Sequence, residues 1–255
     1  MNTKALDLIQ FIGGTSQLAK QCAKELFTKP IYVNLLFVQL HSIGTRSIPL
    51  IFVVAASIGM VMALQYGIGL EKFGGKLYIP KLVSVSIIRE LGPAFASLMF
   101  AARVGAGITS EIASMVVTQQ VDAIRALGTS PIKKIVIPRV LACLIALPLL
   151  TVFANAIGVM GGLVVGTLDL GLDPNFYLQK MRSSIQLADY FSGFGKTIFF
   201  SFFVSLPSCY FGLNTTKGTR GVGGATTKAV VVSCILILIG DYFLTKLFWI
   251  FESWK

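Results

Sequence analysis

The chain has 255 residues, of which 55% are hydrophobic and only 13% are charged, and its mean hydropathy is +0.78. Soluble domains carry about a quarter charged residues, so this composition excludes most soluble enzymes and indicates an all-α, polytopic membrane protein with about five transmembrane helices. The formal net charge of +11 belongs in loops and at interfaces, where anionic lipid head groups or a protein partner offset it, and nucleic acid is the weaker interpretation.

Residues 1–47 are expected to form amphipathic helices that lie in the membrane interface. Charged residues such as Lys24 and Glu25 alternate with apolar ones at a partly helical period, which is expected to break at Pro30. A solvated helical hairpin is the alternative for this pattern. The segment lacks the pattern of a cleaved signal peptide, and residues 48–251 are expected to form the transmembrane domain.

Five apolar stretches are long enough to cross a hydrocarbon core of roughly 30 Å at 1.5 Å per residue. They cover residues 48–66, 82–105, 136–165, 190–212 and 229–251. Five spans place the two termini on opposite sides of the membrane. With the N-terminus inside, the inward segments hold twelve Lys or Arg residues and the outward segments hold six, so the positive-inside rule predicts a cytoplasmic N-terminus.

The second predicted span carries Arg89, Glu90 and Arg103, although an ionised side chain at the bilayer centre costs about 2.5–3.5 kcal/mol. Adjacent helical positions diverge by about 100°, so Arg89 and Glu90 do not neutralise each other on one face. Gly92 and Pro93 follow and are expected to kink or break the helix beside a cavity or inside protein. Arg89 and Glu90 are therefore expected to form a polar wall, with helix assembly as the alternative. Arg103 is expected to be structural and to snorkel toward the cytoplasm.

Asp241 lies near the middle of the last predicted span and has no basic residue four positions away. Its partner is therefore expected on another helix. Arg89 is the first choice because it is similarly deep, and Lys196 of the fourth span is the second. Either pair would fix helix packing as readily as it would bind a ligand, and a structural role for Asp241 is the preferred interpretation.

A cytoplasmic amphipathic helix is predicted between the second and third spans. Apolar residues recur at near-helical spacing over residues 108–127, and Gly128 followed by Pro131 marks the end of the helix. Asp122 and Arg125 add a short polar surface that fits a groove on a partner protein. A purely interfacial anchor is the alternative.

The chain contains no recognisable catalytic, cofactor or metal site. The glycine-rich, basic segment 214–228 is expected to be a cytoplasmic loop that contacts head groups or a partner, because it completes neither a phosphate-loop motif nor a dinucleotide-binding motif. The lone histidine and the four cysteines do not have the spacing of metal ligands. The sequence also shows no recognisable arrangement of a nucleophile with a base and an orienting group. The sequence therefore predicts a protein that is not itself an enzyme.

Eight short motifs follow one another along the chain after about residue 45. They are R-E-L-G-P (Arg89–Pro93), A-A-R-V-G-A (Ala101–Ala106), T-Q-Q-V-D-A-I-R-A-L-G (Thr118–Gly128), P-R-V-L-A (Pro138–Ala142), L-P-L-L-T-V-F (Leu147–Phe153), G-G-L-V-V-G (Gly161–Gly166), G-V-G-G-A-T-T-K-A-V-V (Gly221–Val231) and G-D-Y-F-L-T (Gly240–Thr245). In this order they resemble the MlaE, or YrbE, family of permease subunits from ATP-driven lipid transporters.

The resemblance implies a permease homodimer in the cell inner membrane, with two copies of a separate cytoplasmic ABC ATPase below it and a ring of MCE-domain proteins outside. Phospholipid is the implied substrate, although related permeases for sterols or galactolipid precursors are compatible with these residues. By the same resemblance, Arg89 and Glu90 lie near a lipid-holding cavity at the dimer centre. Leu91, Phe95 and Leu98 of the same span are expected to supply its apolar wall.

The resemblance also assigns a coupling helix, which would dock into the ATPase, to the segment around Glu111–Leu127. The predicted ATPase-coupling residues are Glu111, Thr118, Gln119, Gln120, Asp122 and Arg125. Many family members read T-E-Q where this chain reads T-Q-Q, so this docking surface lacks one negative charge. An ion-coupled secondary transporter that uses Glu90 and Asp241 is the alternative function, although five spans do not divide into equal inverted halves.

Overall fold

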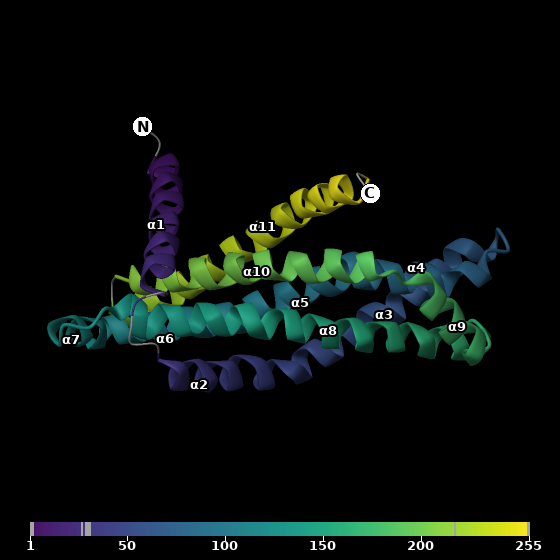
Figure 1. Cartoon of the computed structure of the whole chain (residues 1–255), viewed down its shortest axis with the longest axis horizontal. Coiled ribbons are helices and arrows are strands. Elements are labelled where there is room, and N and C mark those ends of the chain that lie inside the picture. Colours follow the sequence, from purple (N-terminus) through teal and green to yellow (C-terminus); the bar gives the residue numbers. More distant parts are fainter. Residues whose placement is uncertain (1–2, 27, 29–31, 217, 254–255) are drawn as a thin grey trace. The chain divides into compact units, whose positions relative to one another are not determined.

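The computed structural model describes residues 3–26, 28, 32–216 and 218–253 of the chain. Every regular element in these ranges is helical, which confirms the all-α prediction. Five helical runs are long and apolar enough to cross a membrane, as predicted: Val33–Glu71, Lys76–Val117, Ile132–Leu168, Leu187–Leu213 and Gly218–Glu252. Each run is longer than the predicted span, because the helices continue past the ends of the predicted apolar stretches (Figure 1).

The α-helices are α1 (Thr3–Leu26), α2 (Val33–Gly44), α3 (Ile48–Glu71), α4 (Ile79–Ser86), α5 (Gly92–Phe100), α6 (Ala106–Val117), α7 (Gln120–Ala126), α8 (Ile137–Leu168), α9 (Pro174–Ser184), α10 (Leu187–Leu213) and α11 (Gly218–Ser253). Short 3-10 turns at Thr45–Ser47 and Lys76–Tyr78 precede α3 and α4. Wider π-helical turns lie at Ile87–Leu91, Ala101–Gly105 and Ile132–Val136.

The described residues form two compact units. The first unit contains the chain up to Arg46, Phe100–Ala146 and Ser201–Leu236. The second unit contains Ser47–Met99, Leu147–Phe200 and the chain from Ile237 onward. Helices α8, α10 and α11 each contribute one part to each unit.

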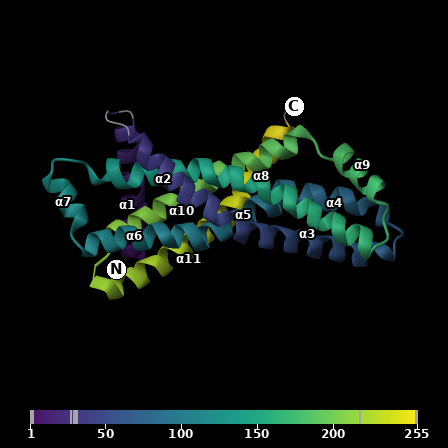
Figure 2. The same cartoon turned by 90° about the horizontal axis from the view of Figure 1, so that it is seen from below.

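In the second unit, glycines allow α3 and α8 to pack with their backbones close together (Figures 1 and 2). A β-carbon on Gly59 would lie 1.8 Å from the carbonyl oxygen of Gly158, and one on Gly161 would lie 2.5 Å from that of Ala56. Small residues at such crossings are a common basis of helix packing in membranes. The buried cluster beside this crossing comprises Ala63, Ile79, Val83, Ile87, Val159 and Val165.

The short helix α9, between the third and fourth spans, is an element that the sequence analysis missed. It begins where Asp173 Oδ2 accepts a hydrogen bond of 2.8 Å from the backbone amide of Phe176, with Pro174 in the first turn. Tyr177 of α9 is fully buried against Gly162 of α8. Burial raises the pKa of Tyr177 well above its ordinary value, so its hydroxyl stays neutral.

In the first unit, α6 packs against α10 through small and hydroxyl side chains. Thr109 Oγ1 lies 3.1 Å from the carbonyl oxygen of Ser208, and a β-carbon on Gly212 would lie 2.8 Å from the side chain of Ile112. Helix α1 contacts the same helix through Phe11, whose ring stacks on that of Phe211 with centroids 5.3 Å apart. The N-terminal region therefore contains helices, as predicted, while the break expected at Pro30 lies outside the described residues.

The predicted helix over residues 108–127 is not continuous. Helix α6 ends at Val117, and α7 begins at Gln120 after Gln119 adopts a positive φ of 59°. Thr118 Oγ1 contributes to this end by donating a hydrogen bond of 2.8 Å to the carbonyl oxygen of Ser114. Apolar periodicity continues across the break and does not reveal it, because the period records burial rather than backbone conformation.

The predicted loop over residues 214–228 is largely wrong, because α11 begins at Gly218. The hydroxyls of Thr226 and Thr227 bond to the carbonyl oxygens of Val222 and Gly223, four residues earlier, at 2.8 and 3.1 Å. These threonine side chains thus form hydrogen bonds within the helix, and the helix continues past them. Glycine and threonine content alone gave a false loop signal here.

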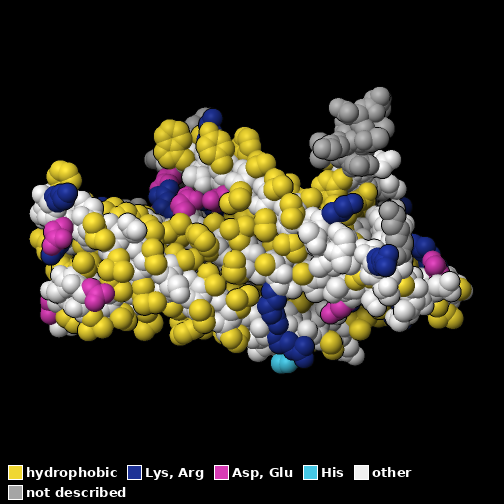
Figure 3. Space-filling view, turned by 180° about the vertical axis from the view of Figure 1, so that it is seen from behind, with side chains coloured by type: hydrophobic (Ala, Val, Ile, Leu, Met, Phe, Trp, Pro, Cys, Tyr) yellow, Lys and Arg dark blue, Asp and Glu magenta, His cyan; other side chains and the backbone are white. Residues whose placement is uncertain are grey.

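The molecular surface matches the composition of the chain. Apolar side chains cover much of the face seen in Figure 3, whereas basic and acidic side chains gather there in small groups. Large side chains on the C-terminal half of α11 are widely exposed, including Tyr242, Phe243 and Trp249 at 65%, 63% and 62%. An apolar surface of this kind is typical of a protein in contact with lipid or with other membrane helices.

Candidate functional site

Two linked groups of charged side chains lie in the second unit. Four carboxylates, those of Glu90, Asp189, Asp241 and Glu252, contact the side chains of two cations, Arg89 and Lys196. We call the contacts of Lys196 the lysine network and those of Arg89 the arginine network. Each network joins the second span to α10 and α11, which lie far from it in the sequence.

Lys196 is the centre of the lysine network, and its side chain is completely buried. Its ammonium group contacts Glu90 in a short ion pair and lies 3.0 Å from Asp241 Oδ1. The contact with Asp241 is an ion pair without the alignment of a hydrogen bond. Lys196 also donates a hydrogen bond of 2.7 Å to Thr245 Oγ1. Three different side chains thus compensate one buried ammonium group.

The arginine network corrects the expected pairing of Arg89 with Asp241. Arg89 Nη1 lies 3.1 Å from Asp189 Oδ1, and Arg89 Nη2 lies 2.8 Å from Glu252 Oε2. Asp189 also accepts a hydrogen bond of 2.8 Å from the backbone amide of Gln186, just before α10. The second choice made from the sequence, Lys196, is the partner of Asp241. Depth in the membrane did not distinguish the two cations, because it says nothing about which helix faces which.

A π-helical turn over Ile87–Leu91 gives Arg89 and Glu90 their separate partners. The amide of Gly92 bonds to the carbonyl oxygen of Ile87, five residues earlier, and the helix then continues through Pro93. Of the predicted kink or break at Gly92 and Pro93, the break is absent from the described run Lys76–Val117, and the local irregularity is this wider turn, which accommodates the proline.

Pro93 nevertheless affects the network. Because proline has no amide hydrogen, it cannot donate the usual helical hydrogen bond to the carbonyl of Arg89. The ammonium group of Lys196 lies 3.3 Å from that carbonyl oxygen and donates to it. One buried lysine thus satisfies a backbone group that the proline leaves without its usual donor.

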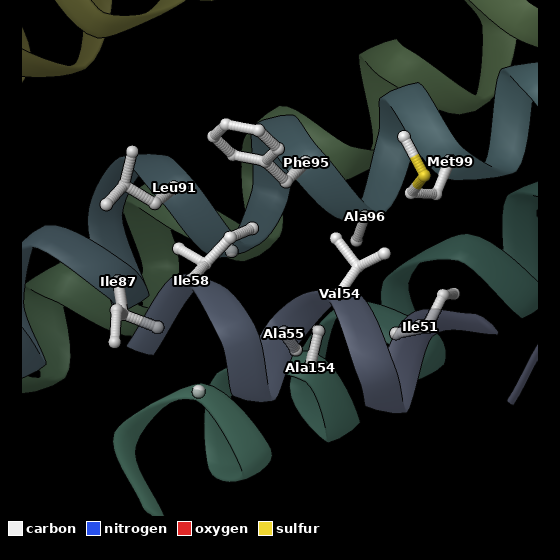
Figure 4. A pocket seen from close by; sticks show the side chains of 12 residues that line it. Ile51, Val54, Ala55, Ile58, Ile87, Leu91, Phe95, Ala96, Met99 and Ala154 are labelled. Carbon is white, nitrogen blue, oxygen red and sulfur yellow. The ribbon is translucent and has the colours of Figure 1, made fainter. Parts of the chain in front are cut away.

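The apolar residues predicted to contact substrate lie elsewhere in the same unit. Leu91 and Phe95 line a narrow crevice between the second span and α3 (Figure 4), together with Ile58 and Val54. The interior of this crevice measures about 10 Å³, which is at most enough for one water molecule. Leu98 is half-buried on α5 and is not among the residues that line it.

The five predicted substrate residues therefore do not surround one cavity within the second unit. Arg89 and Glu90 contact α10 and α11, while Leu91 and Phe95 contact the crevice beside α3. Arg89 already pairs with two carboxylates, which offset its positive charge and weaken its attraction for a lipid phosphate. A larger apolar hollow of about 320 Å³ lies between α8 and α9 and includes the buried Asn155 in its lining.

The predicted coupling residues belong to the first unit, and they separate into three groups. Glu111 Oε2 accepts a hydrogen bond of 2.9 Å from Arg139 Nη2, and this contact links α6 to α8. Asp122 and Arg125 form an ion pair of 3.0 Å on α7, with more than 60% of each side chain exposed. Glu111 thus braces two helices, whereas Asp122 and Arg125 are accessible to a partner.

The remaining coupling residues lie at the junction of α6 and α7. Thr118 bonds to α6, Gln119 forms the left-handed turn, and Gln120 is the first residue of α7. Arg103, predicted to be structural, lies in the π-helical turn Ala101–Gly105 and is half-buried. The sequence missed the role of Arg139, whose side chain is 8% exposed, because it lies at the start of an apolar span without a nearby acidic residue.

Among the described residues, five helical runs are long and apolar enough to cross a membrane, and the ion pairs of Lys196 link three of them, which is typical of a multi-pass membrane protein. Residues 36–247 match the family described as permease MlaE, and the chain belongs to that family. It is 42% identical over 245 residues to a probable ABC transporter permease protein of Rickettsia felis, covering 96% of this chain and 95% of the relative.

Two further relatives carry more specific names. The chain is 33% identical over 214 residues to the intermembrane phospholipid transport system permease protein MlaE of Haemophilus influenzae, covering 84% of this chain and 82% of the relative. It is 30% identical over 210 residues to the chloroplast protein trigalactosyldiacylglycerol 1 of Arabidopsis thaliana, covering 82% of this chain and 60% of the relative. The family resemblance found in the sequence motifs is confirmed.

Proposed function

We propose that this chain is the membrane permease of an ATP-driven transporter that moves phospholipid between the inner and outer membranes. In this proposal two copies form a homodimer in the cell inner membrane, with their N-termini in the cytoplasm. A separate ABC ATPase supplies the energy, and an MCE-domain ring receives or delivers lipid outside. The observation that carries the proposal is the match over most of the chain to a permease named for intermembrane phospholipid transport.

Features of the second unit support a lipid-handling role. Its crevice beside Leu91 and Phe95 is too small to hold an acyl chain, so this crevice is not the lipid chamber, which we place between two copies of the chain. The lysine and arginine networks would line the polar side of that chamber, because Glu90 and Glu252 remain 35% and 41% exposed. A phospholipid would then place its head group beside the networks and its tails against the apolar surface.

The first unit offers a route for coupling to ATP hydrolysis. Helix α7 presents the exposed pair Asp122 and Arg125, and the turn at Gln119 sets its direction relative to α6. We assign docking on the ATPase to α7 and transmission to the link between Glu111 and Arg139, which ties α6 to α8. Movement of α7 would then reach two of the membrane spans.

The test is lipid transfer by a reconstituted complex of this permease with its ATPase. Phospholipid transfer to acceptor vesicles should require ATP hydrolysis, and photo-crosslinkable phospholipid should label the permease. The double variant Arg89→Gln/Glu90→Gln should reduce both signals. Glu71→Gln serves as a control, because Glu71 is 64% exposed and pairs with Lys76 in a simple surface contact. Unchanged transfer and labelling in the double variant would show that Arg89 and Glu90 do not form the head-group site.

An ion-coupled secondary transporter is the second candidate, and one observation favours it. The two networks contain four carboxylates for two cations, so a proton or another cation would bring them closer to charge balance. Transfer driven by a proton gradient without ATP, and abolished by Glu90→Gln or Asp241→Asn, would favour this candidate. Purification without an associated ATPase chain would point the same way.

A further inference from the structure

A hollow of about 190 Å³ lies between α1, α8 and α10 in the first unit. Among the described residues that line it, the side chains are hydrocarbon apart from the thiol of a buried cysteine. The lining includes Ala19, Cys22 and Ala23 of α1, Leu141 and Leu144 of α8, and Phe202 of α10. Apolar cavities of about 150 Å³ stay dry and take up apolar molecules, so this hollow favours an apolar occupant.

Small side chains on α1 create the hollow. Ala19 and Ala23 lie four residues apart on one face of the helix, where larger residues would fill the space against α8 and α10. Protein interiors rarely leave a void of this size, because the surrounding atoms lose dispersion contacts. Ala23 and Phe202 are both exposed, so the hollow opens at the molecular surface.

The position of α1 indicates what lies outside that opening. Helix α1 runs across the neighbouring parts of α8 and α10 rather than along them (Figure 1). Its exposed Lys20 and Lys24 share one side, one helical turn apart. A basic amphipathic helix transverse to membrane spans is the arrangement expected in the head-group region, where acyl chains begin.

A smaller hollow of about 30 Å³ adjoins the first and is more polar. The two share Leu26, Ile137 and Leu141, and the smaller one also reaches Glu25 and Lys133. The ammonium group of Lys133 donates a hydrogen bond of 2.9 Å to the hydroxyl of Thr28, two residues after the end of α1.

The charge beside this polar end favours an anion. Lys133 and the exposed Lys134 provide two cations. Lys24 of α1, which directly precedes Glu25 in the sequence, provides a third. The carboxylate of Glu25 already accepts a hydrogen bond of 2.7 Å from Ser130. An apolar slot that ends at basic side chains matches the two parts of an anionic phospholipid.

We propose that one anionic phospholipid resides in this groove, with an acyl chain in the 190 Å³ hollow and its phosphate beside Lys133. This lipid is a bound component of the permease and is separate from any lipid that it transports. It packs α1 against α8. Because Glu25 and Lys133 flank the turn that follows α7, the lipid also holds that turn in place.

Quenching by brominated lipids tests the groove in the full-length chain. Phe202→Trp places a reporter in its wall, after Trp249→Phe and Trp254→Phe remove the native tryptophans. The protein is reconstituted in phosphatidylcholine vesicles that contain increasing fractions of brominated phosphatidylglycerol or brominated phosphatidylcholine. Brominated phosphatidylglycerol should quench the reporter at low mole fraction and saturate. Phe153→Trp, an exposed position on α8 in the second unit, serves as the control reporter and should show no head-group preference.

Variants separate the head group from the acyl chain. Lys133→Gln should weaken the preference for phosphatidylglycerol about fivefold, the effect of removing one basic residue near a membrane surface, whereas Lys133→Arg should keep it. Lys81→Gln, an exposed lysine of α4, is the control and should change nothing. Ala19→Leu/Ala23→Leu should fill the hollow and reduce quenching by both lipids.

Four results would overturn the proposal. Equal quenching by both lipids would mean ordinary bilayer contact, and no quenching by either would mean that protein covers the hollow. If Lys133→Gln keeps the preference for phosphatidylglycerol, the phosphate does not bind beside Lys133. If the double leucine variant is still quenched as strongly, the acyl chain does not occupy the hollow. If Lys133→Gln does not fold, lipid mass spectrometry of the purified double leucine variant must still show loss of retained phosphatidylglycerol. None of these measurements depends on transport or on an ATPase.

Discussion

Removing the charge of Lys196 should destabilise the protein more than removing any exposed lysine. Lys196→Met keeps the length of the side chain but leaves Glu90 and Asp241 without their shared cation. Breaking a buried ion pair from one side costs about 3–5 kcal/mol. Because the Glu90 side chain is 35% exposed, we expect the low end of that range, about 3 kcal/mol.

Thermal unfolding in detergent measures this effect. A loss of about 3 kcal/mol corresponds to a decrease in Tm of roughly 6–12 °C for a chain of this size. Lys246→Met is the matched control, since Lys246 is an exposed lysine of α11, and its Tm should stay within about 2 °C of the parent protein.

A charge-neutral variant separates electrostatics from packing. In Lys196→Met/Glu90→Gln/Asp241→Asn no charge of the lysine network remains, and most of the lost stability should return. If the triple variant is as unstable as Lys196→Met, the loss arises from packing and our account of the network is wrong. If Lys196→Met alone is no less stable than Lys246→Met, the buried charge does not stabilise the protein, and our account of the network is also wrong.

Three further predictions concern other parts of the fold. Gly59→Ala should cost about 1–3 kcal/mol in thermal or denaturant unfolding, because its β-carbon would meet a backbone carbonyl of α8 at 1.8 Å, whereas Gly69→Ala on the same helix has open space and should be neutral or stabilising. Gln119→Gly should raise stability by up to about 1 kcal/mol by relieving a positive φ of 59°, while Gln120→Gly, at the first residue of α7, should not raise it, and equal effects would exclude backbone strain as the cause. Burial, and to a lesser degree a nearby carboxylate, raises the pKa of Cys22 to about 11, so maleimide labelling of Cys22 should stay slow at pH 7–9 and accelerate only toward pH 11, and rapid labelling at pH 8 would show that the thiol is exposed.

The number of spans was predictable from the sequence because it depends on a one-dimensional property. A run of apolar residues such as Leu147–Phe153 has to leave water whatever it packs against. The ends of the helices were not predictable in the same way. Gly218–Lys228 resembles a loop in composition, yet it is helical, and its threonine hydroxyls bond to carbonyl oxygens of their own helix.

The members of the charge networks were predictable, but their partners were not. Arg89, Glu90 and Asp241 stand out because ionised groups are rare in apolar spans. Pairing depends on helix rotation and on local backbone form, and the π-helical turn before Gly92 changes both. Asp189 and Glu252 lie just beyond the predicted ends of their spans, so no sequence pattern indicated that they lie beside Arg89.

The two networks also constrain how the second span can move. Arg89 and Glu90 are neighbours on one helical turn, yet Arg89 binds near the start of α10 and the end of α11, while Glu90 contacts Lys196 and Thr245, about two turns farther into each helix. A slide of the second span along its axis would therefore stretch both networks at once. Because Lys196 also bonds to the carbonyl freed by Pro93, such a slide would leave a backbone acceptor without its donor. Motion that preserves these contacts must carry the second span, α10 and α11 together within this unit.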